Sequence, residues 1–203
     1  MKDLCEKAMA KGQRIDLSGC SYGETTGCCP FIERPTNYYY FLAGFVRILK
    51  LKNILEIGTH FGGAIMSMAR AIPKRHISRS TLVTIDVTYK NEDGFKAYPY
   101  IKRIFGDSLS DKTVKESITS FTDPIDLLYI DSVHECGHTK KNIDIYAGAL
   151  NPRYIILDDI RQCDSMQRLW SDLVEDFKNR AFDASDISIR KGAGFGVIEW
   201  RKI

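Results

Sequence analysis

Apolar segments of strand length alternate with segments of helical pattern along most of the chain, and this alternation constrains the fold more than any other feature. Strands are predicted at residues 53–57, 80–87, 101–105, 125–130 and 153–157, and helices at 38–49, 63–72, 110–120, 137–149 and 165–180. Each predicted strand is a nearly continuous apolar run, which is typical of parallel strands covered on both faces. We therefore expect a doubly wound α/β fold with a mainly parallel sheet. Residues 187–190 and 194–200 predict an antiparallel hairpin at the C-terminus.

The stretch KNILEIGTHFGG, residues 52–63, joins the first of these strands to a helix through a loop with few side chains. Its glycines allow main-chain N–H groups to approach a ligand. The motif differs from the G-x-G-x-x-G loop of dinucleotide-binding proteins, because Glu56 stands where the first glycine would be. A carboxylate there would repel a pyrophosphate and favour a cation. This argues against a dinucleotide and for a zwitterionic cofactor that carries a sulfonium group.

Acidic residues stand at the ends of all five strands. They are Glu56, Asp86, Asp107, Asp131, Asp158 and Asp159. Ligands of open parallel sheets bind at this edge, near the point where the strand order reverses. One such aspartate would be an ordinary turn residue, but packing does not explain the whole row. Asp86 lies thirty residues beyond Glu56, where an acid can accept hydrogen bonds from the ribose hydroxyls of an adenosine.

Composition excludes several other classes of protein. The net charge is +3 and basic residues form no run longer than a pair, so no nucleic-acid partner is expected. The most hydrophobic run, residues 38–51, contains Arg47 and Lys50 and is too short to span a membrane. The first twenty residues contain no apolar segment of the signal-peptide type. We expect a cytoplasmic protein, in which the vicinal pair Cys28-Cys29 is a pair of ordinary free thiols.

The chain divides into an N-terminal extension, residues 1–36, and a domain, residues 37–203. The extension is expected to contain a helix over residues 2–11, followed by a loop rich in Gly, Ser, Thr and Cys. The aromatic cluster at residues 38–40 either lines a pocket or packs its helix onto the sheet, and we favour packing.

Five motifs together resemble a known family. ILEIGTHFGG, TIDV, FGDS, DLLYIDSVH and YIILDD look like the class I S-adenosylmethionine-dependent methyltransferases. They most resemble the branch that includes metal-dependent sugar and macrolide O-methyltransferases and cephalosporin-hydroxylase-like proteins. The resemblance covers about residues 37–203. It implies methyl transfer from S-adenosylmethionine to a hydroxyl of a small molecule, either a natural-product sugar or a polyhydroxylated metabolite. The acceptor itself cannot be identified, and a homo-oligomer is left open.

The resemblance also implies roles for individual residues. The cofactor-binding set is Glu56, Gly58, Thr59, His60, Gly62, Asp86, Asp107, Ser108 and Asp131. Within it, Gly58 and its neighbours would border the methionine part, although His60 could equally face the solvent. Asp86 would hold the ribose, and Asp107 with Ser108 would border the adenine.

The resemblance further implies metal-assisted catalysis. Asp131, Asp158 and Asp159 would be ligands of a divalent ion, for which oxygen ligands favour Mg²⁺. His134 would be the general base that takes the proton of the acceptor hydroxyl.

Two alternatives belong to other classes. His134-Glu135-Cys136-Gly137-His138 matches the H-E-x-x-H pattern of zinc metallohydrolases. That pattern requires both histidines on one helix, whereas here His134 is expected in the loop before the helix, with His138 in its first turn. The second alternative is a non-catalytic domain that binds the cofactor and serves as a partner or regulator.

Overall fold

The predicted parallel strands lie side by side in one sheet of a computed structural model that describes residues 1–20, 36–88 and 90–201. They are β1 (Asn53–Ile57), β2 (Thr81–Asp86), β3 (Ile101–Phe105), β4 (Leu127–Ile130) and β5 (Tyr154–Asp158). With β6 (Ala181–Asp183) and β7 (Phe195–Glu199), the order is β3-β2-β1-β4-β5-β7-β6. β1 pairs in parallel with both β2 and β4, placing Leu55 opposite Val83 and Leu128. The strand order therefore reverses between β1 and β4, as the doubly wound prediction requires. The pair Cys28-Cys29 lies outside the described residues.

The C-terminal hairpin is present, but its first strand was predicted in the wrong place. β6 begins at Ala181 and pairs antiparallel with β7, which also pairs antiparallel with β5. Residues 187–190 instead belong to the long connection between β6 and β7. Local hydrogen bonds fold this connection into turns, because Ser188 N donates to Ala184 O and Arg190 N to Ser185 O. The turn leaves Arg190 at the carboxyl edge of the sheet rather than inside a strand.

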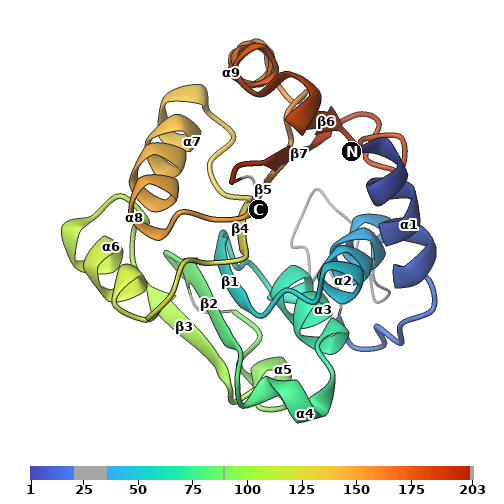
Figure 1. Cartoon of the computed structure of the whole chain (residues 1–203). Coiled ribbons are helices and arrows are strands. Elements are labelled where there is room, and N and C mark those ends of the chain that lie inside the picture. The colour runs from blue at the N-terminus through green and yellow to red at the C-terminus, as the bar shows by residue number, and fades with distance from the viewer. Residues whose placement is uncertain (21–35, 89, 202–203) are drawn as a thin grey trace, which may run out of the picture.

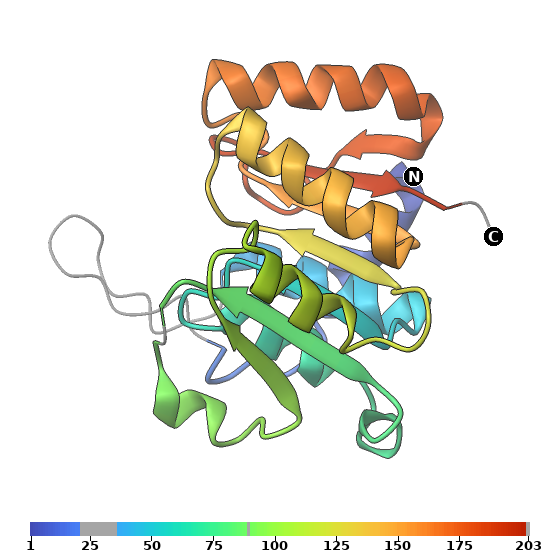
Figure 2. The same cartoon turned by 90° about the vertical axis from the view of Figure 1, so that its left-hand side faces the viewer.

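Helices cover both faces of the sheet (Figures 1 and 2). One face carries α1 (Lys2–Gly12), α2 (Asn37–Leu49) and α3 (Gly63–Ala71). The other carries α6 (Asp111–Ile118), α7 (Cys136–Asn142) and α9 (Asp164–Phe177), and α7 continues through a π-helical turn (Ile143–Ala147) into α8 (Gly148–Leu150). Three short elements were not predicted, namely α4 (Lys74–Ile77), α5 (Glu92–Phe95) and the 3₁₀ turn Lys178–Arg180. No helix within residues 1–20, 36–88 and 90–201 is long and apolar enough to cross a membrane.

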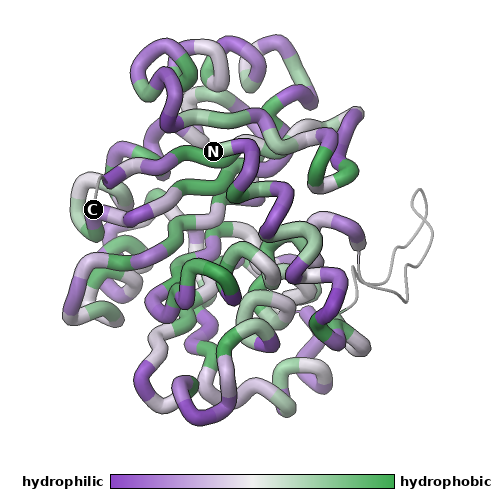
Figure 3. The backbone as a smooth tube through the Cα atoms, turned by 45° about the vertical axis from the view of Figure 1, so that its right-hand side comes forward, coloured by the Kyte–Doolittle hydropathy of each residue, from purple (hydrophilic) through white to green (hydrophobic). Residues whose placement is uncertain are grey.

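Alternate strand residues supply two hydrophobic cores, one on each face of the sheet. Ile54 and Tyr129 face α2 and α3, whereas Leu55 and Leu128 face the layer of α7 and α9. In Figure 3 the hydrophobic green segments gather in the middle of the molecule and the purple ones toward its periphery. Burial on both faces explains why the strands read as continuous apolar runs.

The N-terminal helix α1 packs closely on α2. A Cβ atom added to Gly44 would lie 1.7 Å from the carbonyl oxygen of Ala8, so the two helices meet backbone to backbone. This contact joins the predicted extension to the domain. The boundary at residue 36 stays a prediction, because it falls next to the undescribed residues 21–35.

Candidate active site

A cavity of about 730 Å³ lies at the carboxyl ends of the parallel strands, where the strand order reverses. Many of the predicted site residues line it, namely Gly58, Thr59, His60, Asp86, Asp107, Ser108, Asp131 and His134. Glu56, Gly62, Asp158 and Asp159 are not part of its wall. Tyr38 and Tyr39 belong to the hydrophobic core beneath α2, as the packing interpretation predicts, and they also contribute to the cavity wall, so both interpretations hold for them.

The glycine loop is pressed against the end of β4. Gly58 has a φ of 99°, and a Cβ atom there would lie 1.7 Å from the carbonyl oxygen of Asp131. Only glycine fits this position without moving the backbone. Gly62 also has a positive φ, 81°, but a Cβ there would meet the ring of Phe95 at 2.4 Å. Gly62 therefore shapes the turn into α3 and does not face the ligand space.

Glu56 supports this loop from below. Its side chain is fully buried and accepts a hydrogen bond from the hydroxyl of Thr84. Thr84 Oγ1 lies 2.5 Å from Thr59 Oγ1, so the three side chains connect the end of β1 to the loop above it. Burial raises the pKa of Glu56 well above its usual range, although the Thr84 hydrogen bond opposes this effect.

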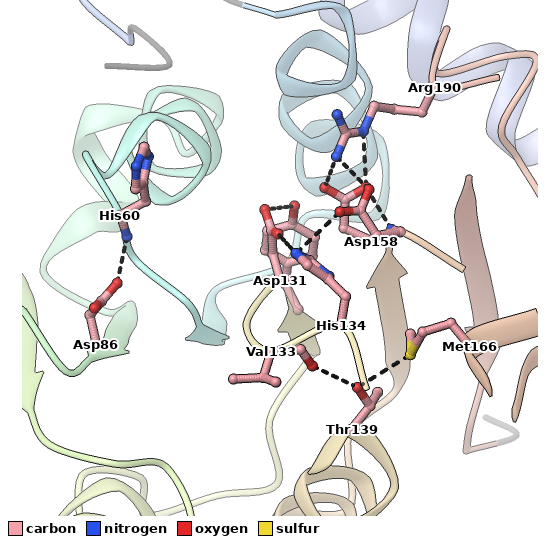
Figure 4. Close-up of polar contacts among 11 residues, drawn as sticks. His60, Asp86, Asp131, Val133, His134, Thr139, Asp158, Met166 and Arg190 are labelled. Carbon is pink, nitrogen blue, oxygen red and sulfur yellow. Dashed lines mark hydrogen bonds and ion pairs between the residues drawn. The ribbon is translucent and has the colours of Figure 1, made fainter. Parts of the chain in front are cut away.

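Asp86 ties the end of β2 to the glycine loop. Its Oδ2 accepts a hydrogen bond of 2.7 Å from the backbone N of His60 (Figure 4). Its Oδ1 accepts one of 2.9 Å from Thr88 N. Each carboxylate oxygen can accept more than one hydrogen bond, so Asp86 retains the capacity to bind hydroxyl groups in the cavity. At the next strand end, Asp107 Oδ1 accepts a bond from Leu109 N at 2.9 Å.

His134 lies in the loop between β4 and α7, as predicted. Thr139 in α7 donates to Val133 O at 3.2 Å, which fastens this loop to the helix (Figure 4). The His134 Nε2 atom lies 3.1 Å from Asp159 Oδ2 and 3.9 Å from Asp131 Oδ1. An ionised carboxylate only accepts hydrogen bonds, so in the neutral imidazole the contact with Asp159 places the ring hydrogen on Nε2 and leaves Nδ1 with a lone pair.

Two of the three predicted metal ligands, Asp158 and Asp159, meet at a residue that sequence reasoning missed. Arg190 binds Asp158 with both arms of its guanidinium: Nε lies 3.0 Å from Oδ1, and Nη2 lies 2.5 Å from Oδ2. The same Nη2 lies 2.8 Å from Asp159 Oδ1. Figure 4 shows the guanidinium of Arg190 directed at the carboxylate of Asp158. In the sequence, Arg190 is visible only as a basic residue of the predicted hairpin, far from the Asp158-Asp159 motif.

Burial and like charge set the protonation behaviour of this cluster. The Asp158 side chain has no exposed surface, and burial together with the neighbouring Asp131 raises its pKa well above the usual range against the opposing charge of Arg190. Burial likewise raises the pKa of Asp131 to about 6, although the Tyr129 hydroxyl, 2.9 Å from Asp131 Oδ2, opposes this effect. The cluster is therefore an acidic site in which one guanidinium is held close.

The arrangement does not fit the predicted magnesium site. Both oxygens of Asp158 are bonded to Arg190, and the two oxygens of Asp159 are bonded to Arg190 and His134. In the described part of the chain, no three His, Cys, Asp or Glu side chains are arranged so that they could hold a metal ion. The carboxylates are thus directed at a guanidinium, which takes the oxygen atoms that a metal ion would need.

The zinc alternative is wrong for a separate reason. Glu135 is the N-cap of α7, and its carboxylate accepts hydrogen bonds from Gly137 N at 3.0 Å and His138 N at 2.9 Å. His134 therefore precedes the helix, while His138 lies inside it with Nδ1 3.0 Å from Asn142 Nδ2. The two histidines do not share a helix face and cannot form the zincin pair.

Comparisons with known proteins agree with this architecture. A family model described as a methyltransferase domain matches residues 55–160, just over half of the 203 residues. The O-methyltransferase of Bacillus cereus, solved in complex with SAH (S-adenosylhomocysteine), is 17% identical with a TM-score of 0.61, over 97% of this chain and 90% of that one. No curated protein matches the chain.

Two further solved structures show the same fold. TomG of Streptomyces achromogenes, an O-methyltransferase involved in tomaymycin synthesis and solved with SAM, is 16% identical with a TM-score of 0.60, over 97% of this chain and 90% of that one. MycE, a methyltransferase of the mycinamycin pathway solved with Mg and SAH, is 14% identical with a TM-score of 0.59, over 92% of this chain and 55% of that one. The chain belongs to the methyltransferase-domain family and has the fold of the class I methyltransferases.

Proposed function

We propose that this protein transfers a methyl group from S-adenosylmethionine to a hydroxyl of a small molecule. The observation that carries the proposal is the cavity that joins the glycine loop and Asp86 on one side to His134 on the other. Such a cavity can hold a cofactor next to a base. Family membership supports methyl transfer, and the similar methyltransferases were solved with SAH, with SAM and, in one structure of MycE, with the small molecule mycinamycin VI.

The cofactor would bind across the ends of β1, β2 and β3. Asp86 would accept hydrogen bonds from the ribose hydroxyls, and Asp107 with Ser108 would border the adenine. The methionine part would lie along Gly58, Thr59 and His60, where the absence of a Cβ at Gly58 keeps the main chain close. Asp131 lies beside this loop, and its carboxyl group favours the positive charge of a sulfonium.

His134 would act as the general base. Asp159 holds the Nε2 side of the ring, so Nδ1 is the nitrogen that can accept a proton. The acceptor hydroxyl would give its proton to Nδ1 while its oxygen attacks the methyl carbon. The carbon–sulfur bond breaks as the carbon–oxygen bond forms, and the products are a methyl ether and SAH. Proximity in one cavity supplies much of the rate, because both reactants are already oriented.

A natural-product sugar or a polyhydroxylated metabolite remains the expected acceptor class. The magnesium-assisted form of the reaction stays a prediction. MycE was solved with Mg, but in this chain Arg190 engages two of the three predicted ligands. Proton removal therefore falls to His134, with Asp159 holding its imidazole.

Calorimetric titration with SAH tests the proposal first. We expect the wild-type protein to bind SAH with micromolar affinity, and Asp86→Asn to bind it about tenfold more weakly, since loss of charge-assisted hydrogen bonds costs about 1.5 kcal/mol or more. Asp172→Asn on the exposed face of α9 is the matched control and should bind like the wild type. A wild-type protein that binds no SAH contradicts the proposal.

Turnover separates the enzyme from a non-catalytic cofactor-binding domain. A panel of hydroxylated acceptors is incubated with S-adenosylmethionine, and SAH formation is measured. His134→Ala should retain SAH binding and lose turnover. Binding without turnover on any acceptor would instead favour the non-catalytic alternative.

A further inference from the structure

We propose that Arg190 is the resident cation of the acidic cluster, standing where a divalent ion would have to bind and positioning Asp159 against His134. The inference rests on the proposed function and makes its reaction independent of a metal. It concerns a residue outside the five motifs that resemble the family. Arg190 is a positioning residue in this proposal, because it acts on the acceptor through Asp159 and His134.

The hydrogen bonds of Arg190 account for the first half of the inference. The guanidinium forms a fork on Asp158, whose side chain is fully buried, and reaches Asp159 with the same Nη2 atom. A forked arginine matches carboxylate geometry and leaves no oxygen of Asp158 without a donor. A divalent ion that bound Asp158 and Asp159 together would have to displace this guanidinium or lie beside its positive charge.

The guanidinium is also fixed from its other side. It lies over the ring of Tyr38, 4.6 Å from the ring centroid, and the Arg190 side chain is 24% exposed. Its backbone is held at both ends, because Arg190 N donates to Ser185 O at 2.8 Å and Gly194 N donates to Arg190 O at 2.7 Å. Ile189, the preceding residue, has a φ of 60°, a conformation that a β-branched residue rarely adopts. The turn therefore aims Arg190 at the cluster.

A continuous path of contacts supplies the second half. Arg190 holds Asp159 Oδ1 at 2.8 Å, and Asp159 Oδ2 lies 3.1 Å from His134 Nε2. The Asp159 carboxylate thus joins the Arg190 guanidinium to the His134 imidazole. Because both oxygens belong to one carboxylate, holding Oδ1 also sets the direction of Oδ2. Fixing Asp159 in this way fixes the ring hydrogen of His134 on Nε2, which keeps Nδ1 as the proton acceptor.

Metal binding by the whole protein tests the inference without any acceptor. Mn²⁺ alone is titrated into metal-free protein and followed by the loss of the free-ion paramagnetic resonance signal. We expect the wild type to bind no Mn²⁺ at micromolar concentrations, and Arg190→Ala to gain at least tenfold in affinity because Asp158 and Asp159 are left without their guanidinium. Arg103→Ala is the matched control, since Arg103 also pairs with a carboxylate, Glu92 at 2.9 Å, and lies over a ring, Phe95 at 4.1 Å, but Glu92 does not belong to the acidic cluster.

The outcomes separate this inference from the proposed function. Micromolar Mn²⁺ binding by the wild type overturns the inference even if Arg190→Ala fails to fold, and it leaves SAH binding as the independent test of the function. The positioning role is tested separately by the ¹⁵N chemical shifts of the His134 imidazole. These signals are assigned as the ones that disappear in His134→Gln. Arg190→Ala should shift them away from the Nε2–H tautomer and Arg103→Ala should not. Unchanged His134 shifts in a folded Arg190→Ala protein overturn the positioning role.

Discussion

Gly58→Ala tests how tightly the glycine loop is pressed against the end of β4. The added Cβ would lie 1.7 Å from the carbonyl oxygen of Asp131, whereas real Cβ contacts are essentially never shorter than 3.0 Å, so loop and strand must separate by about 1.3 Å. That movement strains the hydrogen bond of 2.8 Å from Asp131 N to Ile57 O, which is worth about 1 kcal/mol. The φ of 99° adds about 1–3 kcal/mol of backbone strain for any residue with a side chain.

The expected loss is therefore about 2–4 kcal/mol in the free energy of unfolding. For a chain of this length each kcal/mol lowers the melting temperature by about 2–4 °C, so we expect a decrease of about 10 °C. Urea unfolding and thermal unfolding, both followed by circular dichroism, measure the two quantities. SAH titration well below the melting temperature should also show weaker binding, because the loop that lies along the proposed ligand has moved.

Gly148→Ala is the matched control. A Cβ at Gly148 would meet nothing within 4 Å, and this glycine lies in α8 with a φ of −63°. Alanine is the better helix former by about 1 kcal/mol, so this variant should be as stable as the wild type or more so. A melting temperature of Gly58→Ala within about 2 °C of the wild type, less than the change that about 1 kcal/mol would cause, would refute the close contact between loop and strand.

Two further predictions concern buried and partly exposed titratable groups. Burial raises the pKa of Glu56 above its ordinary 4.5, so the folded state keeps a proton that the unfolded state releases. Its contribution to stability is fully present below pH 4.5 and is lost as the pH rises toward the folded-state pKa, by about 1.4 kcal/mol for each pH unit between the unfolded-state and folded-state pKa values. Glu56→Gln should therefore flatten the dependence of unfolding free energy on pH, and an unchanged slope between pH values of about 5 and 8 would contradict this. Hydrogen bonds from Ser165 and Met166 lower the pKa of Cys163, whereas burial raises the pKa of Cys5 to about 12, so iodoacetamide should modify Cys163 long before Cys5. Mass spectrometry of tryptic peptides follows this order, and equal rates would contradict it.

The sequence determined the central sheet because the period of its hydrophobic pattern is a local property. Strands buried on both faces must be apolar throughout, and all five parallel strands lie within two residues of their predicted ends. The positions of Asp86 and Asp131 at the cavity followed as well. Parallel strands end at one edge, so residues at those ends must meet there.

Only the tertiary structure decided which partner the acidic cluster has. Arg190 lies 31 residues beyond Asp159, in a segment whose alternating pattern suggested a strand. Hydrogen bonds from Ser188 and Arg190 back to residues 184 and 185 fold that segment into a turn instead. Nothing in a local pattern reports such a long-range contact, since it depends on where β6 and β7 attach to the sheet. The sequence thus determined that carboxylates gather at this edge, and the packing of the hairpin connection decided that a guanidinium faces them.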